Sequence, residues 1–152
     1  HGKGSQKYDN VRIGLNSRLD TIQAAILIEK LKLFREELRL RSEVANNYNA
    51  GLAGVCDLPA ISEGIQSAWA QYTLKILSRN RVIDALAAQG IPALVYYPKP
   101  LTQQKAYWSF PKVRTGTPVS ENLSQVVLSL PMHPYLSHTE HDQIIRAVTH
   151  AI

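Results

Sequence analysis

Residues 17–52 read SRLDTIQAAILIEKLKLFREELRLRSEVANNYNAGL, and this stretch predicts a long helix. It contains no proline, and its first glycine is Gly51, so nothing in the backbone interrupts a helix or two abutting helices. Ser17 is a good N-cap residue, and Asp20 would place a carboxylate in the first turn, beside the positive end of the helix dipole. We therefore expect a long connecting helix, or a helix pair, over residues 19–53.

The two halves of this helix differ in how their apolar side chains are distributed. Over residues 19–28 these side chains lie on nearly every side, which is typical of a segment buried all round. From Leu27 onward they form a single stripe, with Lys, Arg and Glu between them. A helix of this kind usually bridges two bodies, and its apolar pattern is too short for a coiled coil. If no second body covers residues 19–28, we expect that surface to be exposed and to drive self-association.

The remaining residues alternate strand-like and helix-like segments, which predicts an α+β fold. The expected elements are strands at 68–76, 92–97 and 128–130, a helix capped by Ser78 or Asn80 and stopped by Gly90, a helix opened by Thr117-Pro118, and a last helix opened by the capping box Ser137–Glu140. These elements suffice for one core. We therefore divide the chain into a loop at 1–18, the connecting helix at 19–53 and a small α+β domain at 54–152.

Composition narrows the class of partner. The 152 residues carry a formal net charge of +5, but the basic residues are dispersed, and those of 30–41 are interleaved with glutamates, as on a solvated helix face. No apolar run approaches the roughly 18–20 residues of a membrane span, and no secretory signal is visible. Cys56 is the only cysteine, which excludes an intrachain disulfide and suggests a reducing compartment. We expect a cytoplasmic protein with no nucleic-acid or membrane partner.

Motifs for other chemistries are missing from the sequence. His138 and His141 stand three residues apart and could both ligate one metal ion. No cysteine or carboxylate cluster at ligand spacing completes the set of ligands. The sequence contains neither a glycine-rich phosphate loop ending in Lys-Ser/Thr nor a G-x-S-x-G motif. We expect no metal site. The chain also begins with His1 and has its only methionine at Met132, so we expect part of a longer polypeptide.

Four strings of residues carry a resemblance to a known family. His1-Gly2, Tyr8 and the stretch GLNSRLDTIQAAIL at 14–27 are followed by AWAQY at 68–72, YYPKPL at 96–101 and SLPMHP at 129–134. The first group resembles the G-x-N-x-R-L/M-D-x-x-Q-A-A segment of the DegT/DnrJ/EryC1/StrS family, and the later strings resemble the same family in the same order. Its members are pyridoxal-phosphate (PLP) aminotransferases that act on nucleotide-linked keto-sugars. The most similar members make 3-amino-3-deoxy-glucuronate nucleotide sugars for bacterial surface polysaccharide.

The resemblance implies the C-terminal portion of a homodimeric fold-type I aminotransferase, with its connecting helix and small domain. The family's Schiff-base lysine lies upstream of the G-x-N-x-R motif, and none of the eight lysines here has its sequence context. PLP chemistry needs that lysine to hold the cofactor and to move a proton. We therefore expect no catalytic residue in this chain, no covalently bound PLP and no activity from the chain alone.

The resemblance also assigns binding roles, each with an alternative. Asn16 would hydrogen-bond the PLP phosphate of the partner subunit, or would only close the turn before the helix. Arg18 would contact the sugar, such as a uronate carboxylate, or would pair with Asp20 or an upstream acid. In the first helical turn its charge would oppose the dipole. Tyr96 and Tyr97 would line the mouth of the active site, although strand alternation would turn one of them into the core.

Two departures from the family pattern and two other functions stay open. The family often has histidine in place of Tyr96 and usually has it in place of Thr102, so a substrate role of those histidines does not carry over to this chain. The leading function is amino transfer, from glutamate, to a nucleotide-linked keto-sugar. A sugar dehydratase of the same family, with histidine in place of the lysine, is one alternative. A non-catalytic module whose basic helix contacts DNA or a protein partner is the other.

Overall fold

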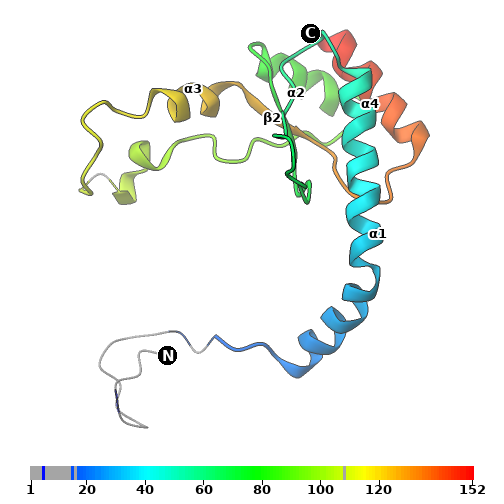
Figure 1. The fold of residues 1–152 in the computed structure, drawn as a ribbon. Helices are drawn as coiled ribbons and strands as arrows, with labels where there is room; N and C mark the ends of the chain where they lie inside the picture. Colours follow the sequence, from blue (N-terminus) through cyan, green and yellow to red (C-terminus); the bar gives the residue numbers. More distant parts are fainter. Residues whose placement is uncertain (1–4, 6–14, 16, 108) are drawn as a thin grey trace. The chain divides into compact units, whose positions relative to one another are not determined.

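The computed structural model describes Ser5, Leu15, residues 17–107 and residues 109–152. It forms two compact units, one ending at Glu36 and the other running from Glu37 to Ile152. In chain order the elements are helix α1 (Thr21–Gly51), strand β1 (Tyr72–Lys75), helix α2 (Arg79–Ala87), the 3₁₀ turns η1 (Leu101–Gln103) and η2 (Lys105–Tyr107), helix α3 (Pro118–Val126), strand β2 (Val127–Leu130) and helix α4 (His138–Ala151) (Figure 1). None of the helices in the described part of the chain is long and apolar enough to cross a membrane.

Helix α1 is a single helix of 31 residues, which confirms the expected long helix. Its predicted start at Ser17 is wrong. The carbonyl oxygen of Asp20 accepts the first helical hydrogen bond, from the amide of Ala24 at 2.8 Å, and the amide of Asp20 donates to Oε1 of Gln23 at 3.2 Å. Asp20 is therefore the capping residue, with Gln23 reaching back to it as in a capping box.

The apolar side chains of α1 have two different environments. In the first unit, Leu19, Ile22, Ile26, Leu27 and Ile28 are all exposed in the described structure. In the second unit, Val44, Ala45 and Tyr48 of the same helix are buried. The second half of α1 thus belongs to the core, whereas the surface expected to be covered over residues 19–28 is open.

The core of the second unit lies on one face of a two-stranded sheet. β1 and β2 are antiparallel, with Tyr72 opposite Leu130 and Leu74 opposite Leu128. Residues directly opposite each other point to the same face, so these four side chains form one apolar layer. They are buried together with side chains of α1, α2 and α4, among them Tyr48, Leu52, Val82, Leu86, Ile144 and Val148. The other face carries Thr73 opposite Ser129.

The predicted strand over residues 92–97 is wrong. This segment makes only an isolated bridge in which Leu94 exchanges two backbone hydrogen bonds with Ser129, at 3.1 and 2.8 Å. Pro92 has no amide proton to donate, and Tyr97 adopts φ +60°, outside the β region. The expected strand at 68–76 is likewise shortened to β1, with Trp69 at φ +46° before it.

The three shorter helices confirm the predicted positions of the helix ends, although Ser78 makes no side-chain capping bond to α2. Ser78 precedes α2, and Gly90 follows it at φ +71°, where the amide of Gly90 donates to the carbonyl of Ala87 and that of Ile91 to the carbonyl of Leu86, each at 3.0 Å. This pair of bonds is the Schellman motif, which glycine accommodates without strain. Helix α3 begins with Pro118 after Thr117, and α4 begins at the capping box Ser137–Glu140.

Candidate functional site

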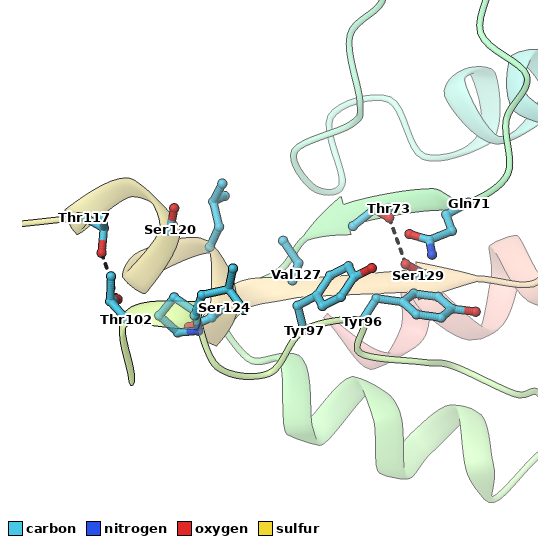
Figure 2. A pocket seen from close by; sticks show the side chains of 13 residues that line it. Gln71, Thr73, Tyr96, Tyr97, Thr102, Thr117, Ser120, Ser124, Val127 and Ser129 are labelled. Carbon is cyan, nitrogen blue, oxygen red and sulfur yellow. Dashed lines mark hydrogen bonds between the residues drawn. The ribbon is translucent and has the colours of Figure 1, made fainter. Parts of the chain in front are cut away.

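A cavity of about 480 Å³ lies on the face of the sheet that carries Thr73 and Ser129. Its other walls are the loop from Tyr96 to Thr102 and the side of α3 that carries Ser120 and Ser124. Figure 2 shows Tyr96 and Tyr97 beside β2, with Thr102 and Thr117 at one end and Gln71, Thr73 and Ser129 at the other. We call this space the sheet cavity.

The sheet cavity is uncharged and mainly apolar in surface, with several hydroxyl groups among its lining residues. None of the described residues that line it is charged, and most of them carry a hydroxyl or amide group. Oγ1 of Thr73 and Oγ of Ser129 share a hydrogen bond of 2.8 Å on its floor. Pro100, Leu101 and Val127 add apolar surface. Neutral hydroxyls beside aromatic rings suit a ligand that presents both hydroxyl groups and C–H surface, as a sugar ring does.

The hydroxyl of Thr102 has a fixed direction. Thr117 Oγ1 donates to a carboxylate oxygen of Glu121 at 3.0 Å, and a carboxylate can only accept. The single hydroxyl proton of Thr117 is therefore used, so the hydrogen bond of 3.1 Å between Thr102 and Thr117 is donated by Thr102. Thr102 is left with acceptor lone pairs only, which favour a donor on a ligand.

Both predicted tyrosines line the sheet cavity. Tyr96 is 41% exposed and Tyr97 is 81% exposed, so neither is a core residue, contrary to the alternative drawn from strand alternation. The left-handed backbone of Tyr97 breaks that alternation. Such a conformation is costly for a bulky residue, by about 1–2 kcal/mol, and Pro98 adds to this cost because a following proline favours the β region. Tyr97 therefore has a strained backbone beside the sheet cavity.

The other two predicted binding residues lie in a different part of the chain. Arg18 belongs to the first unit, is exposed, and forms no ion pair with Asp20. It precedes Thr21, so the prediction that it stands in the first helical turn is wrong. Asn16 lies outside the described residues, and its assignment as a phosphate ligand stays a prediction.

The hydroxyl residues around the tyrosines were missed from the sequence. Thr73 and Ser129 belong to strands far apart in the chain, and Ser120 and Ser124 come from α3. One signal was available: Gln71 and Thr73 alternate with the apolar Tyr72 and Leu74, which marks a polar face of β1. Among the described residues no group of three or more His, Cys, Asp or Glu could hold a metal ion.

Known proteins resemble this chain along nearly its whole length. UDP-2-acetamido-2-deoxy-3-oxo-D-glucuronate aminotransferase from Pseudomonas aeruginosa is 41% identical over 150 residues, which are 98% of this chain and 41% of that protein. A DegT DnrJ EryC1 StrS aminotransferase from Brucella abortus superimposes with a TM-score of 0.89 at 49% identity, over 97% of this chain and 40% of that one. The S. venezuelae protein DesV, solved in complex with a ketimine intermediate, superimposes with a TM-score of 0.86 at 33% identity, over 97% and 40% of the two chains.

These matches fix the family and the fold. The chain spans about two fifths of the length of each of these relatives. The solved relatives are fold-type I aminotransferases, and the α+β arrangement of a long helix followed by a small sheet flanked by helices is confirmed. The family of PLP-dependent sugar aminotransferases that the sequence strings indicated matches residues 1–149. The chain belongs to the DegT/DnrJ/EryC1/StrS aminotransferase family.

Proposed function

We propose that this chain forms the substrate side of a PLP-dependent aminotransferase that passes an amino group, from glutamate, to the keto carbon of a nucleotide-linked sugar. The observation that carries the proposal is the 41% identity, along 98% of the chain, to an aminotransferase of a UDP-linked 3-oxo-glucuronate. The product of such a reaction is an amino sugar of the kind used in bacterial surface polysaccharide. In this proposal the chain divides into a loop at 1–18, a connecting helix at 19–53 and a small domain at 54–152, and the enzyme is a cytoplasmic homodimer.

The sheet cavity supports this role through its chemistry. Tyr96 and Tyr97 offer ring faces for the C–H surface of a sugar and phenol groups for its hydroxyls. The lone pairs of Thr102 accept from a sugar hydroxyl at the far end of the cavity. These residues orient the sugar. Arg18 is assigned to a carboxylate of the substrate by the family resemblance.

The described residues do not fit the covalent attachment of PLP. No described lysine lines the sheet cavity. Lys75 pairs with Asp57 at 2.9 Å, and Lys32 pairs with Glu29. By the family resemblance the Schiff-base lysine comes from a segment upstream of Asn16, and Asn16 serves the PLP phosphate of the partner subunit. We therefore derive no chemical step through PLP from these residues and assign this chain no catalytic residue.

A transamination assay tests the proposed function. The product of the complete reading frame that contains this chain, supplied with PLP, glutamate and the UDP-linked 3-oxo sugar, should form 2-oxoglutarate and an amino sugar detectable by mass spectrometry. The 152-residue chain alone should form neither, because it lacks the lysine context. Absence of turnover by the complete product with UDP- and dTDP-linked keto-sugars would overturn the proposal, as would turnover by the 152-residue chain alone.

A pair of tyrosine variants tests the part played by the sheet cavity. Tyr97→Ala should raise the KM for the keto-sugar about fivefold, since a stacking aromatic contact contributes about 1 kcal/mol. Tyr107→Ala is the matched control, because Tyr107 is a partly exposed tyrosine of η2 that does not line this cavity. Equal KM values for the two variants would remove the sheet cavity from the substrate site.

A further inference from the structure

A second, smaller cavity of about 280 Å³ adjoins the sheet cavity. Thr102 and Thr117 line both spaces, so the hydrogen bond between them forms part of a shared wall. The smaller cavity is also lined by Lys112 and Arg114, from the loop before α3. We call it the loop cavity. A neutral cavity and a basic cavity therefore meet at two threonines.

A tight turn presents the basic residues of the loop cavity. The amide of Gly116 donates to the carbonyl of Val113 at 3.0 Å, and this bond closes a four-residue turn. Gly116 has φ +70°, a conformation that glycine adopts without strain. Arg114 occupies the second position of the turn, and Lys112 directly precedes the turn. The backbone thus holds both cations beside the same space.

The two cations are available to a ligand. Within the described part of the chain, neither Lys112 nor Arg114 has a hydrogen-bond or ion-pair partner, and both are exposed. Glu121 is the carboxylate that lines the loop cavity, and it accepts the hydroxyl proton of Thr117. Two positive charges against one negative charge leave the loop cavity positive, whereas no charged residue lines the sheet cavity.

We infer that Lys112 and Arg114 bind the phosphate groups of a nucleotide-linked sugar whose uncharged part occupies the sheet cavity. The guanidinium fork of arginine matches two phosphate oxygens at once, and a lysine ammonium adds a point charge. A diphosphate joined to a neutral polyhydroxylated group has the same order of charged and uncharged parts as the two adjoining cavities. The identity of the ligand rests on the proposed function, but the anion site rests on the loop residues themselves.

Nucleotide binding, measured apart from catalysis, tests this inference. The complete reading-frame product would be titrated with UDP and with uridine by isothermal calorimetry, as wild type and as the double variant Lys112→Ala/Arg114→Ala. We expect UDP to bind about tenfold more weakly to the variant, since charge-assisted phosphate bonds are lost, and uridine to bind equally to both proteins. Raising the salt concentration should weaken UDP binding to the wild type more than to the variant.

The matched control is Lys105→Ala/Arg146→Ala. It removes one lysine and one arginine that are exposed and line neither cavity. UDP affinity within twofold of wild type in the control, with the tenfold loss in the loop variant, supports the inference. Equal loss in both variants shows a general charge effect and overturns it, as does unchanged affinity in the loop variant or no binding of UDP to the wild type.

The anion site and the proposed function can be contradicted independently of each other. If the protein transaminates the keto-sugar while Lys112→Ala/Arg114→Ala binds UDP normally, the anion site is wrong and the proposed function stands. If UDP binding depends on these residues but no keto-sugar is transaminated, the anion site stands and the proposed function is wrong.

Discussion

At the scale of single residues, Thr117 links the two walls of the site. Its hydroxyl accepts from Thr102 and donates to Glu121, so Thr117→Val removes two hydrogen bonds while keeping the volume of the side chain. We expect the free energy of unfolding to fall by about 0.5–1.5 kcal/mol, because the site is only half-buried and water can replace part of what is lost. Urea unfolding measures the change. Thr115→Val, at an exposed residue of the preceding turn, should change the free energy by less than about 0.5 kcal/mol; an equal loss there would contradict this account.

His141 is the residue from which a pH dependence of stability is expected. It is buried, its ring meets that of Tyr48 edge-on with centroids 4.4 Å apart, and its Nε2 has no partner within the described residues. Burial lowers the pKa of His141 below its ordinary value of 6.5, and the nearby His138 lowers it further, against smaller opposing effects of Asp142 and of a backbone hydrogen bond with Val44. Below pH 6.5 the unfolded chain therefore binds a proton that the folded chain resists.

The free energy of unfolding should accordingly decrease as the pH falls below 6.5, until the folded-state pKa of His141 is passed. Urea titrations between pH 7.5 and pH 5 would measure this decrease. His141→Phe should flatten the dependence of the free energy of unfolding on pH, since a phenyl ring keeps the contact with Tyr48 and does not titrate. His150→Gln, at an exposed position, should leave this pH dependence unchanged. A profile unchanged by His141→Phe would assign the pH dependence to other groups.

At the scale of elements, the start of α4 depends on a capping box. Oγ of Ser137 accepts from the amide of Glu140 at 3.3 Å, and the Glu140 carboxylate accepts from the amide of Ser137 at 2.9 Å. We expect Ser137→Ala to lower the free energy of unfolding by about 1 kcal/mol. Ser78→Ala is the control, because Ser78 precedes α2 without a side-chain capping bond and should change stability by only a few tenths of a kcal/mol. Thermal unfolding of both variants measures the difference. An equal loss of stability in the two variants would mean that the capping box of α4 does not stabilise the protein.

The sequence predicted the elements whose signals are local, and it failed where a tertiary contact or a special backbone angle intervenes. The stop at Gly90, the proline start of α3 and the capping box of α4 each depend on neighbouring residues, and each is confirmed. The prediction of a strand at 92–97 was wrong because Tyr97 adopts φ +60°, a backbone angle that the residue type does not predict. Family strings contain both the tyrosines and Ser129, but only tertiary pairing brings them together with Thr73: β1 pairs Thr73 with Ser129, and the bridge at Leu94 places the tyrosine segment beside Ser129.

At the scale of the whole molecule, the first unit leaves apolar surface open. Leu19, Ile22, Ile26, Leu27 and Ile28 are 47–73% exposed on ten consecutive residues, a density that soluble monomers rarely show. The relatives are about two and a half times as long as this chain, which leaves ample polypeptide to cover such a surface in them. We therefore expect the isolated chain to self-associate through this part of α1.

Sedimentation equilibrium measures that association. The isolated chain should show an apparent mass that rises above 17.0 kDa with concentration. Ile22→Glu/Ile26→Glu should return the mass to that of one chain, because two carboxylates on the open side of α1 oppose its burial. Leu77→Glu/Val119→Glu changes two exposed apolar residues of the second unit and should leave association intact. A single-chain mass for the unaltered chain at high concentration, or dissociation by the control variant, would show that this surface of α1 does not mediate the contact.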